Sequence, residues 1–260
     1  MLNFTTTGTA TDMAPLLIVH GLFGSARNWG VISKRLSDQR LVVSVDMRNH
    51  GESPRHATQS YPDMAADLEQ VLDHLTPIHG AFHVLGHSMG GKAAMVLALT
   101  RPDLLKSLIV ADISPVVYDH DNTHLIHAMR DLDLAQIERR SEADAALEHD
   151  IPNAGVRAFL LQSLVTKEKK WLLNLDVLEA EMPKIVGFPE VSGSYSGSAF
   201  FVSGGESTYV SRDHRPTTKS LFPNAKFASI PGTGHWLHAE KPREFEAACR
   251  AWMTAIDARP

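Results

Sequence analysis

Short apolar runs that alternate with helical patterns limit what this 260-residue chain can fold into more than any other feature. Each run is too short for a helix and is bounded by turn-forming or charged residues, which is typical of buried parallel strands. The runs cover residues 16–19, 41–45, 82–85, 108–111 and 199–202, and residues 225–230 are predicted as the final strand. Helical patterns cover residues 29–36, 64–75, 89–99 and 243–256. This alternation predicts an α/β fold, with right-handed crossovers over a mostly parallel, doubly wound sheet.

The alternation stops between residues 115 and 190, where no strand pattern is found. Helix-forming segments at 125–137, 143–149 and 170–182 replace it, and no low-complexity linker precedes or follows them. We therefore predict one core built from residues 1–114 and 191–260, with an all-helical insertion at 115–190. Such an insertion is expected at the carboxyl ends of the strands, where α/β sheets bind ligands, and we predict that it is a lid.

One serine stands where a predicted strand turns into a helix. The sequence Gly86-His87-Ser88-Met89-Gly90 follows the apolar run at 82–85 and opens the helical pattern at 89–99. A sharp turn of this kind exposes the serine at the edge of the sheet. The flanking glycines are needed because neighbouring segments crowd the turn. The pattern predicts that Ser88 is a nucleophile.

A serine nucleophile needs a histidine base, and that histidine needs a carboxylate that fixes its tautomer. The segment 231–236, Pro-Gly-Thr-Gly-His-Trp, follows the last predicted strand directly. Its two glycines permit a tight, exposed turn. We therefore choose His235 as the base among the fourteen histidines, with His238 as the alternative.

Attack on a carbonyl group also needs two backbone N–H groups that bind the negative oxygen of the intermediate. One comes from the residue after the nucleophile, here Met89, and the other from the loop after an earlier strand. The loop His20-Gly21-Leu22-Phe23-Gly24 follows the run at 16–19, and its glycines let the amides turn inward. We predict that Leu22 is the second donor of this oxyanion hole, with Phe23 beside it.

Four motifs in this order resemble those of the α/β-hydrolase superfamily. They are His20-Gly21, the segment Asp46-Met47-Arg48-Asn49-His50-Gly51-Glu52-Ser53, Gly86-His87-Ser88-Met89-Gly90-Gly91, and Gly234-His235. The match runs through nearly the whole chain and, more narrowly, is similar to the small bacterial YbfF-type esterases. The resemblance implies an α/β-hydrolase fold with a helical lid inserted after the sixth strand. It also implies activity on short acyl esters and acyl-CoA thioesters, without a cofactor. We interpret segment 46–53 as a structural turn that shapes the pocket floor.

The third catalytic residue has two candidates. Most of the superfamily carries its acid a few residues beyond the strand at 199–202, where this chain has serine and threonine instead. Asp112, however, ends the run at 108–111 at the same sheet edge, and YbfF-type esterases take their acid from that strand. We assign Asp112 on this resemblance, with Glu206 as the alternative and Ser207 as a hydrogen-bonding support for the histidine.

Together these residues predict a serine carboxylic-ester hydrolase that forms an acyl-enzyme. We expect short to medium acyl esters, because the insertion is short and encloses a limited apolar volume. Acyl-CoA thioesters are a further substrate class that the resemblance implies. The alternative is a ligand-binding or signalling protein that retains the triad but turns over slowly.

Composition and charge exclude several other classes of protein. The net charge is −5, and the only basic cluster is the short patch at 167–170, so we expect no nucleic-acid partner. We expect a cytoplasmic protein without membrane insertion. No apolar stretch reaches about 18 residues, and residues 1–7 lack the pattern of a signal peptide. The oligomeric state stays open.

Cysteine and histidine are two further residue types that could carry chemistry. Cys249 is the only cysteine, so no internal disulfide can form, and the apolar rhythm around it predicts burial. His120, His124 and His127 approach the spacing of metal ligands. A catalytic metal site needs a third convergent ligand and an open position, so we interpret these histidines as polar surface of the lid and expect no metal.

Overall fold

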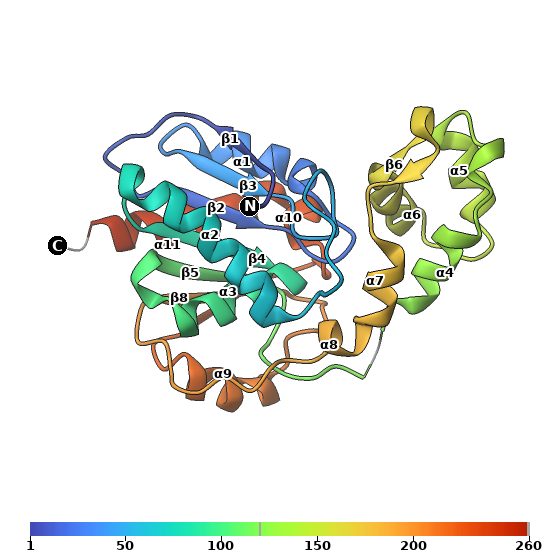
Figure 1. Cartoon of the computed structure of the whole chain (residues 1–260). Helices are drawn as coiled ribbons and strands as arrows, with labels where there is room; N and C mark the ends of the chain where they lie inside the picture. The colour runs from blue at the N-terminus through green and yellow to red at the C-terminus, as the bar shows by residue number, and fades with distance from the viewer. Residues whose placement is uncertain (120, 259–260) are drawn as a thin grey trace.

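A seven-stranded sheet forms the centre of the computed structural model, which describes residues 1–119 and 121–258 (Figure 1). The strand order is β1-β3-β2-β4-β5-β8-β9. The strands are β1 (Phe4–Thr7), β2 (Leu16–Val19), β3 (Val42–Val45), β4 (Phe82–His87), β5 (Leu105–Ala111), β8 (Ala199–Gly204) and β9 (Lys226–Ile230). All neighbours pair in parallel except β1, which pairs antiparallel with β3. The predicted mostly parallel, doubly wound sheet is confirmed.

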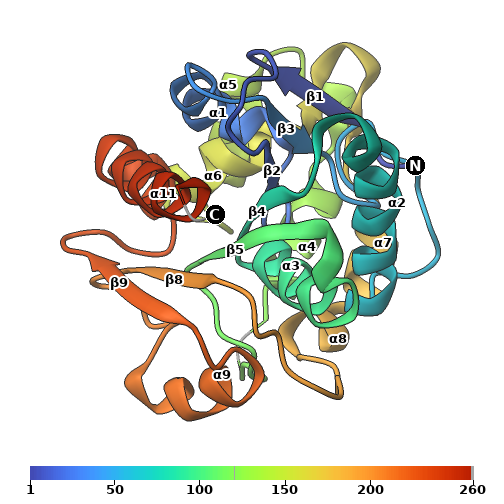
Figure 2. The same ribbon diagram turned by 90° about the vertical axis from the view of Figure 1, so that its left-hand side faces the viewer.

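Helices cover both faces of this sheet. Figure 2 shows α1 and α11 on one side and α2 and α3 on the other. The core helices are α1 (Gly30–Leu36), α2 (Tyr61–His79), α3 (Met89–Thr100), α9 (Arg215–Leu221), α10 (Leu237–Glu240) and α11 (Pro242–Asp257). Successive residues of a strand point to opposite faces. Accordingly, Leu17 and Val19 pack into the core beneath α2 and α3, whereas Leu16 and Ile18 pack beneath α1 and α11. Both faces of β2, β3, β4, β5 and β8 are buried, so these strands read as continuous apolar runs, whereas the edge strand β9 is mostly exposed.

The sequence pattern missed strand β1. Its sequence is Phe-Thr-Thr-Thr and its residues are half-buried or exposed, so it lacks the apolar run by which the other strands were recognised. The strand exists because it pairs with β3, about forty residues later in the chain. One antiparallel strand, β1, and four parallel strands, β2 to β5, precede the insertion. The insertion thus follows the fifth strand along the chain, and not the sixth as expected.

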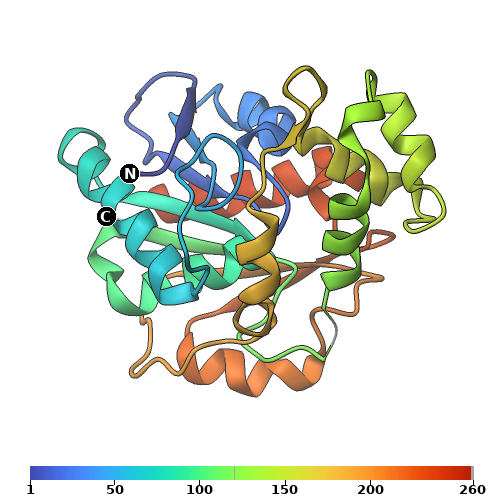
Figure 3. The same cartoon turned by 45° about the vertical axis from the view of Figure 1, so that its right-hand side comes forward.

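The segment between β5 and β8 forms a separate group of short elements beyond the carboxyl ends of the strands (Figures 1 and 3). Its helices are α4 (Thr123–Asp131), α5 (Arg140–Leu147), α6 (Ala154–Leu160), α7 (Leu175–Ala180) and α8 (Met182–Val186). Two-residue strands β6 (Leu164–Val165) and β7 (Lys170–Trp171) pair antiparallel, so the insertion is not all-helical. The helix expected to start at residue 170 starts at Leu175, because the left-handed turn at Lys169 (φ +51°) returns the chain for this pairing.

Within the part of the chain that the structure describes, no helix is long and apolar enough to cross a membrane. Cys249, a residue of α11, is buried in the core, as its position in the apolar pattern predicted, and burial raises the pKa of its thiol.

Candidate active site

Ser88 occupies a sharp turn between β4 and α3. Its backbone has φ +52° and ψ −121°, a conformation that side-chain-bearing residues rarely adopt. A Cβ atom on Gly86 would lie 2.3 Å from the Gly90 carbonyl oxygen, and one on Gly90 would lie 2.4 Å from the His20 carbonyl oxygen. Both distances are far below contact distance. The glycines around Ser88 are therefore required by crowding, as the sequence predicted.

His235 and Asp112 are 123 residues apart in the sequence and are in contact in the structure. The imidazole Nδ1 lies 2.7 Å from Asp112 Oδ2, with His235 in the loop after β9 and Asp112 directly after β5. The Asp112 side chain is fully buried and also accepts hydrogen bonds from the Gly204 amide (2.9 Å) and the Ser207 hydroxyl. An ionised carboxylate only accepts hydrogen bonds, so His235 carries its proton on Nδ1. Its Nε2 is then left to accept a proton, the tautomer that a general base needs.

The two alternatives, Glu206 and His238, do not form this pair. Glu206 is exposed, and among the described residues no hydrogen bond joins its carboxylate to His235. His238 is buried and stacks on Trp29, with ring centroids 4.2 Å apart and an interplanar angle of 7°. Burial lowers the pKa of His238 to about 3. The geometry therefore favours Asp112 and His235.

Two aromatic neighbours of His235 were not singled out from the sequence. The ring of Tyr209 stacks on the imidazole, with centroids 3.9 Å apart and an interplanar angle of 20°. His87 Nε2 donates to the His235 carbonyl oxygen at 2.8 Å. Burial lowers the pKa of His87 well below its usual value, so it acts as a neutral donor. The residue before Ser88 thus holds the histidine loop in place, a role that no local pattern reveals.

The predicted oxyanion loop passes close to Ser88. A Cβ atom on Gly21 would lie 3.2 Å from Ser88 Cβ, so only glycine allows this approach without displacement. The Phe23 amide, however, donates to His50 Nε2 at 3.1 Å. Burial lowers the pKa of His50 to about 3, which keeps this nitrogen an acceptor. The Phe23 amide is therefore already engaged, and the expectation that it assists the oxyanion hole is corrected. Leu22 and Met89 remain as candidate donors.

Segment 46–53 supports this loop, but none of its residues lines the cavity beside Ser88, so the expectation that it shapes the pocket floor is wrong. The Asp46 carboxylate accepts from the Ala26 amide at 2.8 Å and from the Glu52 amide at 3.0 Å. Asp46 therefore ties the turn to the loop that follows β2, and it lies outside the cavity beside Ser88.

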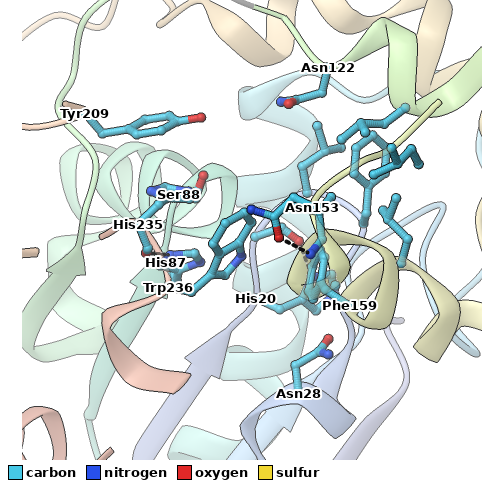
Figure 4. Close-up of a pocket in the computed structure, with 18 of the residues that line it drawn as sticks. His20, Asn28, His87, Ser88, Asn122, Asn153, Phe159, Tyr209, His235 and Trp236 are labelled. Atoms are coloured by element: carbon cyan, nitrogen blue, oxygen red, sulfur yellow. Dashed lines mark hydrogen bonds between the residues drawn. The ribbon is translucent and has the colours of Figure 1, made fainter. Parts of the chain in front are cut away.

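A cavity of about 360 Å³ lies between the sheet edge and the insertion, and Ser88 and His235 both line it (Figure 4). Its apolar lining includes Trp29, Leu125, Ile151, Val156, Phe159 and Trp236. Predominantly apolar pockets of this volume with a few polar groups typically hold small organic molecules.

The two described histidines among the possible metal ligands, His124 and His127, do not converge. His127 is exposed and contacts Glu179 at 2.5 Å, whereas His124 lines the cavity. His120 lies outside the described residues. Across residues 1–119 and 121–258, no group of three or more His, Cys, Asp or Glu side chains could hold a metal ion.

Lys92, one helical turn after Ser88, is a buried basic residue. Its ammonium donates to the carbonyl oxygens of Val116 (2.8 Å), Val186 (2.9 Å) and Gly187 (2.5 Å). These residues lie at the two ends of the insertion, so Lys92 ties both ends to the nucleophile helix. Its side chain faces the rings of Tyr118 and Tyr61, at 4.6 Å and 5.7 Å from their centroids. Burial lowers the pKa of Lys92 from 10.5 to about 7.

This pKa predicts how stability depends on pH. Between pH 7 and 10.5 the unfolded chain binds a proton at Lys92 that the folded chain does not, so the free energy of unfolding should rise with pH. The gain relative to Lys92→Met should be on the order of 4 kcal/mol across this range. Urea unfolding of both proteins at several pH values measures the difference, and parallel curves would contradict the prediction.

Comparison with known proteins identifies the family of this chain. A model of the alpha/beta hydrolase fold matches residues 14–151, which is more than half of the chain. The chain belongs to the α/β-hydrolase family. This match confirms the predicted fold class, and the relatives described next confirm the resemblance to YbfF-type esterases.

Individual relatives cover nearly the whole α/β-hydrolase chain. It is 39% identical over 242 residues to esterase YbfF of Escherichia coli, covering 92% of this chain and 93% of that protein. It is also 39% identical over 257 residues to the mouse protein named sn-1-specific diacylglycerol lipase ABHD11, covering 95% and 82% of the two chains. A solved structure described as a marine microorganism esterase superposes with a TM-score of 0.90 at 36% identity, covering 96% and 98% of the two chains.

Proposed function

We propose that this α/β-hydrolase is a serine carboxylic-ester hydrolase in which Ser88, His235 and Asp112 act together. The observation that carries the proposal is the 2.7 Å contact between His235 Nδ1 and buried Asp112, beside the cavity that Ser88 lines. A base oriented in this way and a serine on a strained turn are the two requirements of nucleophilic acyl transfer. Relatives named esterase and diacylglycerol lipase support the same class of substrate.

In the proposed first step, His235 Nε2 takes the Ser88 proton while Ser88 Oγ attacks the ester carbonyl carbon. The carbonyl oxygen becomes negative and is bound by the amides of Leu22 and Met89, each of which contributes about 3 kcal/mol of transition-state stabilisation. When the intermediate collapses, the bond to the alcohol oxygen breaks. His235 returns its proton to that oxygen, so the alcohol leaves neutral and Ser88 stays acylated.

Water completes the cycle by the same route. His235 removes a proton from water, the resulting hydroxide attacks the acyl-enzyme, and the carboxylic acid is released as Ser88 regains its proton. These steps use only groups of the chain itself, so the proposal includes no cofactor. Acyl-CoA thioesters follow the same scheme with a thiol as leaving group, and we include them as a second substrate class.

The proposal is tested with wild-type protein and p-nitrophenyl esters of two to ten acyl carbons, compared with acyl-CoA thioesters of the same lengths. We expect steady-state release of p-nitrophenol with saturation, after a burst where deacylation is slower than acylation. A burst equal to one active-site equivalent, followed by no appreciable turnover on any ester or thioester, would instead support a ligand-binding or signalling protein that retains the triad.

A further inference from the structure

Ser88 borders two cavities of very different size. The large cavity of about 360 Å³ was described above, and a small one of about 40 Å³ lies on the other side of Ser88, toward α3 and α8. The two cavities share Leu22, Ser88, Asn122 and Tyr209 in their linings, so they meet at the nucleophile. An ester held at Ser88 therefore has two places for its two substituents.

His235 lines the large cavity and is not among the residues that line the small one. In the proposed reaction the alcohol oxygen must receive its proton from His235, so this oxygen has to lie within hydrogen-bond reach of the imidazole. The alcohol is thereby directed into the large cavity. The small cavity, which is lined by Leu22 and Met89, is left for the acyl chain.

The small cavity has walls that are held firmly. Met89, Ile113, Ile185 and Val186 supply its apolar surface, and the Lys92 side chain lies against it. The Lys92 Nζ lies within hydrogen-bond distance of the carbonyl oxygens of Val116, Val186 and Gly187. These bonds hold both ends of the insertion against α3. The Tyr61 hydroxyl further bonds the Ile185 carbonyl at 2.5 Å.

We infer that this chain hydrolyses esters of a short acyl group with a bulky, apolar alcohol, the acyl group entering the small cavity and the alcohol entering the large one. The inference rests on the proposed function and deepens it by naming the substrate class. A volume of about 40 Å³ is roughly three times what one water molecule needs, so acyl groups of up to about four carbons fit. The large cavity accepts a substituent several times bigger.

A pair of isomeric esters tests this division in the wild-type protein. Heptyl acetate and methyl octanoate have the same formula and nearly the same apolar surface, and they differ only in which side of the ester carries the long chain. We expect kcat/KM, measured by titration of the released acid, to be at least about tenfold higher for heptyl acetate. Equal values, or a preference for methyl octanoate, would overturn the inference while leaving ester hydrolysis intact.

Two variants show which cavity sets each preference. Ile185→Ala enlarges the small cavity and should raise kcat/KM for methyl octanoate relative to heptyl acetate by about tenfold. Phe159→Ala changes only the large cavity and is the matched control, since Phe159 does not line the small one. It should alter the preference among acetate esters of different alcohols and leave the acyl-length preference unchanged.

The outcomes separate the inference from the proposed function. If neither isomer is hydrolysed faster by wild-type protein than by Ser88→Ala, the proposed function fails and the inference with it. If both are hydrolysed but Phe159→Ala, and not Ile185→Ala, changes the acyl-length preference, the acyl chain occupies the large cavity and only the inference fails. The wild-type measurement decides the question even if Ile185→Ala does not fold.

Discussion

Replacing Ser88 with alanine should lower kcat for ester hydrolysis on the order of 10⁶-fold, the largest effect expected of any single substitution. The reason is that the hydroxyl forms the bond to the acyl group, and no neighbouring group can take over that bond. Steady-state rates with p-nitrophenyl butanoate measure the loss. Substrate binding should persist, because the cavity walls are unchanged.

The matched control is Ser220→Ala. Ser220 is an exposed serine in α9 whose hydroxyl bonds only the Thr217 carbonyl at 2.8 Å, far from the cavity. It should keep the wild-type rate, and an organophosphate should label this variant but not Ser88→Ala. Ester hydrolysis by Ser88→Ala at the wild-type rate would remove the proposed mechanism.

Replacing Asp112 with asparagine should lower kcat about 10⁴-fold while the protein stays folded. An asparagine can still accept a hydrogen bond from the Gly204 amide through its carbonyl oxygen. Its NH₂ group would then face His235 Nδ1, which favours the tautomer with the proton on Nε2. That tautomer cannot remove the Ser88 proton, and no carboxylate would balance the imidazolium that forms. The rate is measured with the same ester across a pH series.

Glu206→Gln is the control that separates the two candidate acids. Because Glu206 is exposed and, among the described residues, forms no hydrogen bond with His235, its amide variant should keep the wild-type rate within about twofold. A larger loss in Glu206→Gln than in Asp112→Asn would reverse the assignment. Circular dichroism and urea unfolding should accompany both variants, because Asp112 also holds the loop that contains Ser207.

Local sequence patterns predicted most of the strands and the turn that holds Ser88. The apolar runs located the parallel strands β2, β3, β4, β5 and β8 to within a few residues, because strands buried on both faces need apolar side chains at each position. The Gly-x-Ser-x-Gly turn was recognisable for a similar reason, since the crowding around Gly86 and Gly90 excludes any side chain. Strand β1 escaped detection because pairing with the distant strand β3 creates it, and the hairpin β6–β7 escaped detection because each of its strands is only two residues long.

The amino-acid sequence by itself determined the α/β-hydrolase fold, the position of Ser88 at the turn and the position of His235 after the last strand. Each of these depends on side-chain size and apolarity within a few neighbouring residues. Only the tertiary structure decided that Asp112 and not Glu206 meets His235, that the Phe23 amide is taken by His50, and that Lys92 joins both ends of the insertion. These are contacts between segments far apart in the chain, and their geometry depends on how the strands and loops pack together in space.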